Sequence, residues 1–145
     1  MPLVSLFTVV VALAAASAIG VAWQRRNGRF TVPPSGQEAP MLQELGWQPG
    51  TPLTLLQFSS AFCAPCRATR VLCEQAAQTI DGVRHVEVDA ESHLDAVRAL
   101  GILRTPTVLL VDGEGHIVRR ASGQPTRAQL LGAIDAVLGQ FTTTR

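Results

Sequence analysis

Two cysteines, Cys63 and Cys66, stand where a short apolar segment gives way to an amphipathic one. The run Leu53–Phe58 is too brief for a helix and is typical of a buried strand. The segment Ala64–Thr79 predicts a helix, because its apolar residues recur at helical spacing while its charged residues can face water. The pair therefore marks a strand-to-helix corner. It could be a redox pair, half of a metal site, or two core residues.

A redox pair suits this corner. Residues i and i+3 in the first turn of a helix lie near the Cα separation that a disulfide accepts. Cys63 stands at or just before the predicted helix start, where unpaired backbone N–H groups and the positive end of the helix dipole stabilise a thiolate. Cys66 lies one turn further and is placed to resolve a mixed disulfide. Pro65 falls in the first turn, where its missing N–H costs little.

A metal site and a pair of core residues account less well for the two cysteines. A closed zinc site needs four ligands, usually Cys or His, and no second close pair exists among Cys73, His85, His93 and His116. We therefore expect no metal, and an exposed corner is a poor place for core residues. Cys73 lies about 10 Å along the helix from Cys66, which is too far for a disulfide. It is expected to be a buried, inert thiol, with a regulatory thiol as the alternative.

The later segments alternate between strand and helix patterns. An alternation of this kind that ends in a hairpin predicts an α/β fold with a mixed central sheet flanked by helices. Thr105-Pro106 directly precedes one of the strands. A proline there is ordinary, but together with the cysteine pair it is informative, because X-Pro bonds tolerate the cis form. The predicted elements are Val83–Asp89 (strand), Ser92–Leu100 (helix), Thr107–Val111 and His116–Ala121 (a hairpin), and Thr126–Leu138 (helix).

An uncharged run from Leu3 to Trp23 precedes these elements. At about 1.5 Å per residue it can cross a hydrocarbon core of about 30 Å. Ala16-Ser17-Ala18 imitates a cleavage site, but a signal peptide carries positive charge before its apolar run, and here the arginines follow it. We expect residues 1–23 to be an uncleaved, single-pass anchor in the cell membrane. The positive-inside tendency favours a cytoplasmic domain, with an extracytoplasmic domain as the alternative.

Residues 24–50 are rich in proline and glycine and predict a tether. Within this linker, Met41–Leu45 predicts one helical turn and Phe30–Val32 a short edge strand. The folded domain is expected at residues 51–145. The net charge of +1 gives no reason to expect a nucleic-acid partner, and three cysteines do not form a disulfide framework.

From about residue 50 to about residue 140 the chain resembles the thioredoxin family. The resemblance is carried by Phe62-Cys63-Ala64-Pro65-Cys66 after the first strand, by Val86-Glu87-Val88-Asp89, by Gly101-Ile102-Leu103-Arg104-Thr105-Pro106-Thr107, and by Gly123 before the last helix. It implies a thioredoxin-like fold without a cofactor and a disulfide between Cys63 and Cys66. In that family the first cysteine attacks a substrate disulfide and the second resolves it.

The resemblance also implies how substrate and electrons arrive. The residue before a cis proline holds the substrate chain as an added strand, so Thr105 and Pro106 are expected at the substrate site, with Phe62 and Gly123 on its rim. The expected partners are protein disulfides and an electron-donating reductase.

The chain departs from the family pattern beneath the disulfide. Gln57 stands where a buried Asp normally helps to move the proton of the second cysteine, and an amide cannot accept that proton. His85 and Val71 replace the usual Lys and helix proline, and Phe62 replaces the usual Trp. We therefore expect slower or differently tuned proton handling.

These observations together predict a membrane-tethered thiol–disulfide oxidoreductase that acts as a reductase. The alternatives are a redox-inert thioredoxin-like adaptor, or an extracytoplasmic protein that serves oxidative folding or cytochrome maturation.

Overall fold

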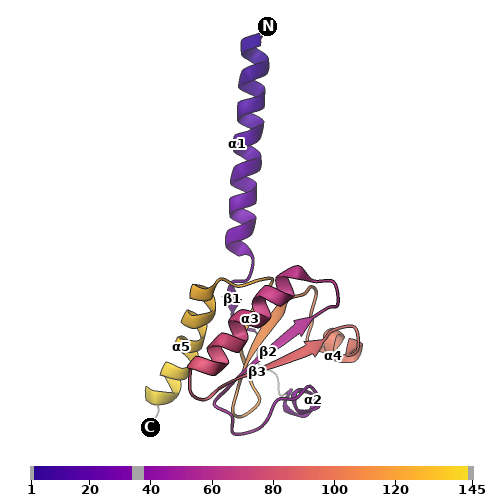
Figure 1. Cartoon of the computed structure of the whole chain (residues 1–145), viewed down its shortest axis with the longest axis vertical. Coiled ribbons are helices and arrows are strands. Elements are labelled where there is room, and N and C mark those ends of the chain that lie inside the picture. Colours follow the sequence, from indigo (N-terminus) through magenta and orange to yellow (C-terminus); the bar gives the residue numbers. More distant parts are fainter. Residues whose placement is uncertain (1, 34–37, 144–145) are drawn as a thin grey trace.

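A five-stranded mixed sheet forms the centre of the computed structural model, with helices on both of its faces (Figure 1). The structure describes residues 2–33 and 38–143, so Pro34 and Ser35-Gly36 of the expected linker lie outside the described residues. The strands lie in the order β1-β5-β4-β2-β3, and only the β2–β3 pair is parallel. The elements are α1 (Pro2–Arg26), β1 (Phe30–Thr31), α2 (Ala39–Glu44), β2 (Leu53–Ser59), α3 (Ala64–Thr79), β3 (Val83–Asp89), α4 (Leu94–Ala99), β4 (Thr107–Asp112), β5 (Ile117–Ser122) and α5 (Arg127–Thr143).

Strand β2 is buried along its whole length, which explains why its sequence is almost continuously apolar. Its side chains alternate between two core clusters. Leu53 and Leu55 pack with α3 and α5, whereas Leu56 and Phe58 pack with α2 and α4. Full burial of such side chains contributes about 1.5–3 kcal/mol each to folding. The expected α/β fold with a sheet covered on both faces is confirmed.

Most element boundaries lie within one or two residues of those expected, but α5 continues to Thr143, past its expected end at Leu138. The start of α4 differs in an informative way. The helix expected from Ser92 begins at Leu94 instead. The Ser92 hydroxyl donates to the Asp89 carboxylate, and no side chain caps the helix at His93. The Ser92 side chain therefore stabilises the turn after β3 and does not cap the first turn of α4.

Part of the expected linker is built into the domain. The expected edge strand and helical turn are present as β1 and α2. Strand β1 pairs antiparallel with β5, and Leu42, Leu45 and Trp47 belong to the buried core. The indole Nε1 of Trp47 donates to the Asp112 carbonyl at 2.9 Å. The division of the chain at residues 23 and 50 remains a prediction.

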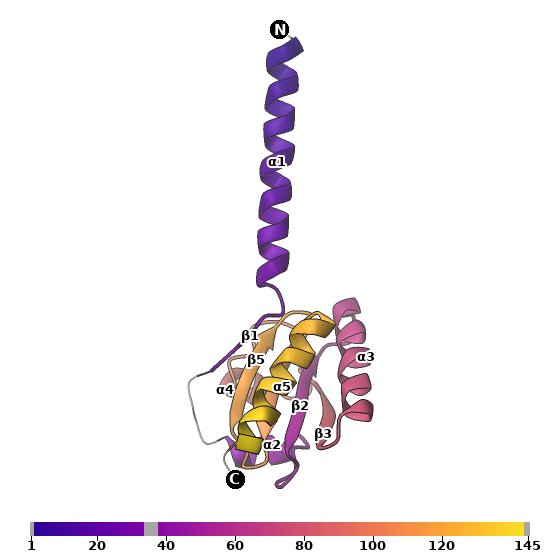
Figure 2. The same ribbon diagram turned by 90° about the vertical axis from the view of Figure 1, so that its left-hand side faces the viewer.

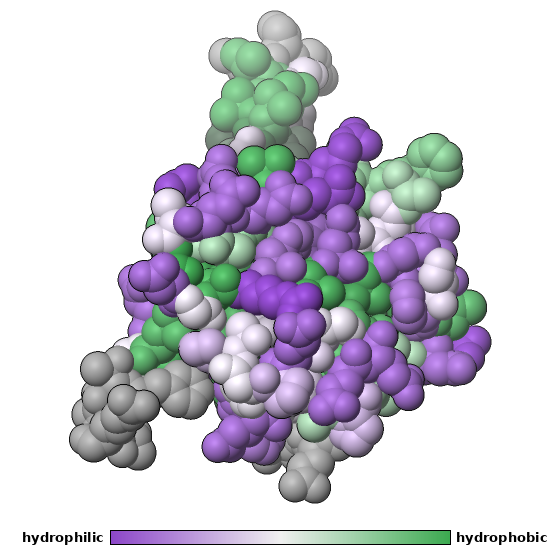
Figure 3. Space-filling model, turned by 60° about the horizontal axis from the view of Figure 1, so that its bottom comes forward, coloured by the Kyte–Doolittle hydropathy of each residue, from purple (hydrophilic) through white to green (hydrophobic). Residues whose placement is uncertain are grey.

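Helix α1 projects away from the domain and makes no packed core with it (Figures 1 and 2). Its stretch Ser5–Arg26 is long and apolar enough to cross a membrane, by length and composition. Its apolar side chains are exposed, Leu13 and Ile19 among them. The opposite end of the molecule is mostly hydrophilic (Figure 3).

Candidate active site

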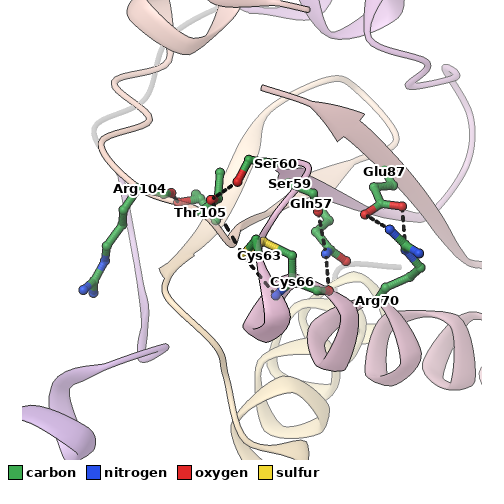
Figure 4. The surroundings of a disulfide bond; sticks show 10 residues. Gln57, Ser59, Ser60, Cys63, Cys66, Arg70, Glu87, Arg104 and Thr105 are labelled. Carbon is green, nitrogen blue, oxygen red and sulfur yellow. Dashed lines mark hydrogen bonds and ion pairs between the residues drawn. A yellow bond between two sulfur atoms is a disulfide. The ribbon is translucent and has the colours of Figure 1, made fainter. Parts of the chain in front are cut away.

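The two sulfur atoms of Cys63 and Cys66 form a disulfide at the start of α3, with a Cα–Cα distance of 5.2 Å (Figure 4). Cys63 occupies the N-cap position, with extended backbone angles, and its Sγ accepts a hydrogen bond from the backbone N–H of Cys66 at 3.2 Å. Pro65 lies in the first turn, as expected. The strand-to-helix corner therefore points a backbone N–H group of the first helical turn at the outer sulfur.

The two cysteines differ in accessibility. Cys66 is 1% exposed, whereas Cys63 is half-buried and its neighbour Phe62 is fully exposed. An incoming sulfur can therefore reach Cys63 but not Cys66. This asymmetry is the one that an attacking and a resolving cysteine require.

A second segment reaches the disulfide from the start of β4. The Thr105-Pro106 bond is cis, as expected, and the Thr105 hydroxyl donates to Cys63 Sγ at 3.8 Å. The same hydroxyl is 2.9 Å from that of Ser60, which comes from the β2–α3 loop. Ser60 was not identified from the sequence, since its partner lies 45 positions away. The structure thus brings Thr105 and Pro106 together with the cysteine pair, while their contact with substrate remains a prediction.

A fully buried amide lies beneath the disulfide. Gln57 donates through Nε2 to the Cys66 carbonyl and to the Ser59 hydroxyl, both at 2.9 Å. Its Oε1 lies 3.1 Å from His85 Nε2. Both amide hydrogens are used, so the amide oxygen faces the imidazole, which must carry its proton on Nε2. Two of the departures noted in the sequence, Gln57 and His85, therefore form one hydrogen-bonded unit, attached to the backbone of Cys66.

An ion pair continues this polar unit to the surface. Arg70 of α3 binds Glu87 of β3, with an Nε–Oε2 distance of 2.6 Å. Burial alone would raise the pKa of Glu87, but hydrogen bonds from Arg70 and Ser59 outweigh it and lower that pKa. An open hollow beside the disulfide is lined by Ser59, Ser60, Ala61, Arg70, Glu87 and Asp89. Nothing in the sequence indicates that Arg70 and Glu87 pair, because they meet only in the folded chain.

Cys73 lies under α3 and takes no part in this site. It is fully buried in the core cluster and unpaired, and burial raises the pKa of its thiol to about 12. Nearby carboxylates of Glu74 and Glu87 add to the shift. A thiol in this state is a poor nucleophile, which agrees with the expected inert role.

Gly123 is buried and has a positive φ of 92°, a conformation that suits glycine. A Cβ at this position would collide with the side-chain oxygen of Asn27. The space above Gly123 is therefore filled by the chain itself, which differs from the open substrate rim expected from the sequence. A substrate contact at Gly123 remains a prediction.

One group of potential metal ligands exists among the described residues, away from the cysteines. Ligand atoms of Asp112, Glu114 and His116 lie within 4.8 Å of one another. One Asp112 oxygen already accepts the backbone N–H groups of Glu114 and His116. The group closes the β4–β5 turn at the other end of β4 from Thr107, so it has no part in chemistry at the disulfide.

The thioredoxin family model matches residues 48–136, more than half of the chain. This chain belongs to the thioredoxin family. A curated thioredoxin from Mycoplasma genitalium is 26% identical over 77 residues, which cover 53% of this chain and 74% of that protein. A mutant thioredoxin from Halobacterium salinarum NRC-1 superposes with a TM-score of 0.58 at 19% identity, covering 66% of this chain and 81% of its own. Chloroplastic thioredoxin z superposes with a TM-score of 0.54 at 23% identity, covering 62% of this chain and 81% of its own.

These likenesses agree with the geometry of the site. At identities below 25%, the two solved thioredoxins support the fold alone. The family match and the close cysteine pair support thiol–disulfide oxidoreductase chemistry for this thioredoxin-family chain.

The burial of His85 predicts a pH dependence of stability. Burial lowers the pKa of His85 below its ordinary value of 6.5, partly offset by the charges of Glu74 and Glu87 and reinforced by Arg70. The unfolded chain then binds the proton first as the pH falls. The free energy of unfolding should therefore decrease as the pH drops from above 6.5 through the folded-state pKa.

The matched variant is His85→Gln, which keeps a neutral hydrogen-bonding side chain beside Gln57. Denaturant unfolding at about pH 7.5 and about pH 5.5 should show a smaller loss of stability for the variant than for the parent chain. His93 and His116 are present in both proteins, and their contributions cancel. Equal losses in the two proteins would contradict the assignment of this titration to His85.

Proposed function

We propose that this thioredoxin-family chain is a membrane-tethered reductase of protein disulfides, with Cys63 as the attacking sulfur and Cys66 as the resolving one. The observation that carries the proposal is the asymmetry of the pair. The outer sulfur is accessible and receives a helical N–H, whereas the inner sulfur is buried. An N–H group aimed at a sulfur stabilises the thiolate, which is the nucleophile in thiol–disulfide exchange.

In the proposed cycle, the Cys63 thiolate attacks one sulfur of a substrate disulfide. A mixed disulfide forms and the other substrate sulfur leaves as a thiolate, which takes up a proton. Cys66 then loses its proton and attacks Cys63 Sγ, which releases the second substrate thiol and leaves the Cys63–Cys66 disulfide seen here. Two electrons and two protons from a dithiol reductase return the pair to its reduced form.

The substrate segment is proposed to lie in extended form beside Thr105 and Pro106, with Phe62 on the rim. Thr105 is close enough to donate a hydrogen bond to Cys63 Sγ, so a chain held there would present its sulfur to the nucleophile. If the substrate segment is bound through its backbone, as in strand addition, substrates of many different sequences could bind.

The anchor in this proposal is α1, and the domain lies in the cytoplasm. Its support is the apolar stretch Ser5–Arg26 and the arginines that follow the apolar run. In that compartment a thiol pool and a reductase would keep the pair reduced, which sets the direction of electron flow.

Thiol labelling in whole cells tests the direction and the location together. In a Cys73→Ala background, acid quenching followed by alkylation should find the pair mostly reduced. A membrane-impermeant maleimide should label Cys63 only after lysis. Labelling in intact cells would place the domain outside and support the oxidative alternative. A pair that stays oxidised even with added dithiothreitol would indicate a redox-inert adaptor.

A further inference from the structure

The junction between α1 and the domain is short and fixed. Residues 27–29, here called the connector, separate the end of α1 at Arg26 from the start of β1 at Phe30. The N–H of Asn27 still bonds to the Trp23 carbonyl at 3.0 Å, and that of Gly28 bonds to the Ser122 carbonyl at 2.9 Å. The chain thus passes from the helix to the sheet without a flexible stretch.

Close packing of glycines holds the connector in place. Gly28 is buried with a φ of 72°, and a Cβ there would collide with the Gln124 carbonyl. On the other side, Asn27 fills the space above Gly123. Gly28 leaves room for the backbone of Gln124, and Gly123 leaves room for the side chain of Asn27. The connector and the segment after β5 therefore fit together in one arrangement.

The connector meets the domain beside the disulfide. The N–H of Gly123 bonds to the Pro106 carbonyl at 2.7 Å, and Arg104 donates to the Ser122 carbonyl at 2.8 Å. Thr105 lies between Arg104 and Pro106 in the chain, and its hydroxyl donates to Cys63 Sγ. Figures 1 and 2 both show the N-terminal end of α3 at the end of the domain from which α1 projects. An anchored α1 therefore holds the disulfide on the side that faces the bilayer.

The surface at this end has the chemistry of a membrane interface. Two apolar side chains flank the active-site segments and are almost completely exposed, Phe62 at 101% and Leu103 at 96%. Three arginines, Arg26, Arg29 and Arg104, line one hollow between the connector and the segment before Pro106. Exposed apolar tips beside arginines suit the boundary between acyl chains and anionic headgroups. The far end of the domain is mostly hydrophilic (Figure 3).

We infer that the fixed connector keeps the Cys63–Cys66 face against the membrane surface, and that the substrates are disulfides in juxtamembrane segments of membrane proteins. This inference rests on the proposed reductase function. In this arrangement, an extended substrate segment that leaves the bilayer would pass close to Thr105 and could pair with its backbone. A disulfide on a bulky soluble domain would have to enter the narrow layer between this domain and the lipid.

Proteoliposomes that contain the full-length chain test the inference. The substrates are single-span peptides with one disulfide loop placed about 4 or about 25 residues from the span, which as flexible coils reach about 11 Å or about 28 Å. The chain should reduce the near loop about ten-fold faster than the far loop, because a fixed face raises the effective concentration only for a loop within its reach. An insertion of about 20 Gly/Ser residues between Arg26 and Asn27 should remove the preference.

The matched control carries the same insertion after Arg145, where it leaves the connector intact, and it should keep the preference for the near loop. Reduction of soluble insulin in detergent should be equal for all three proteins. Insulin reduction together with equal or reversed rates on the two loops would overturn the inference while the reductase function stands. Failure to reduce insulin and both peptides would overturn the proposed function itself.

Discussion

Replacing Cys63 with serine is expected to lower the rate of insulin reduction by about three orders of magnitude or more, to the level of the uncatalysed reaction with dithiothreitol. The hydroxyl of serine has no ionised form at neutral pH to attack a disulfide sulfur. Cys66 cannot take over, because its side chain is 1% exposed beneath the outer residue. The measurement is the initial rate of insulin precipitation with purified full-length protein. Full activity in Cys63→Ser would refute the role of this sulfur as the nucleophile.

The two other cysteines supply the controls. Cys66→Ser should also stop turnover, but it should accumulate a mixed disulfide between Cys63 and the substrate that disappears on reduction. Cys73→Ala should retain activity near that of the parent chain, since Cys73 is buried under α3 and makes no disulfide. If Cys66→Ser captures nothing while Cys63→Ser is inactive, the order of attack and resolution proposed here is wrong.

Replacing Trp47 with alanine is expected to destabilise the domain by about 3–5 kcal/mol. The indole is 3% exposed in the core cluster with Leu42 and Leu56, and its Nε1 donates to the Asp112 carbonyl. A domain of this size has about 5–15 kcal/mol of stability in total, so the loss is a large fraction of it. Denaturant unfolding of the full-length chain, followed by circular dichroism, measures the effect.

Gln48→Ala is the matched control, because Gln48 is the exposed neighbour of Trp47 and should change stability by less than about 0.5 kcal/mol. A Trp47→Ala protein as stable as the parent chain would show that the Trp47 side chain contributes little to the core. The expected loss means that a fragment beginning at residue 51 would lack a side of its core. Useful fragments should begin before β1, at the connector.

The central strands and the strand-to-helix corner with the cysteine pair could be predicted because their signals are local. The runs Leu53–Phe58 and Thr107–Val111 are short and apolar, and the cysteine pair stands between a strand pattern and a helix pattern. The packed part of the linker could not be predicted in the same way. Its proline and glycine content is typical of a tether, while the partners of Trp47 and Phe30 are Asp112 and Ala121, far along the chain.

The residues around the disulfide show the same difference between local signals and contacts made only in the folded chain. Gln57 and His85 were noticed in the sequence as departures from a pattern, but only the fold shows that they bind each other and the carbonyl of Cys66. Ser60 meets Thr105 across 45 positions. Gly123 was expected to leave room for a substrate, and the structure places Asn27 there. No local pattern encodes such pairings, since each depends on how the helices and loops pack.

The strand order also places β3 at the border of the sheet, paired only with β2. An unpaired border strand can join the sheet of a neighbouring copy and start aggregation. Strand β3 carries Arg84, Glu87 and Asp89 along its length, and Arg70 of α3 is bound to one of these charges. Charged side chains along a border strand disfavour such pairing. We therefore expect little edge-to-edge association of crowded copies on this side.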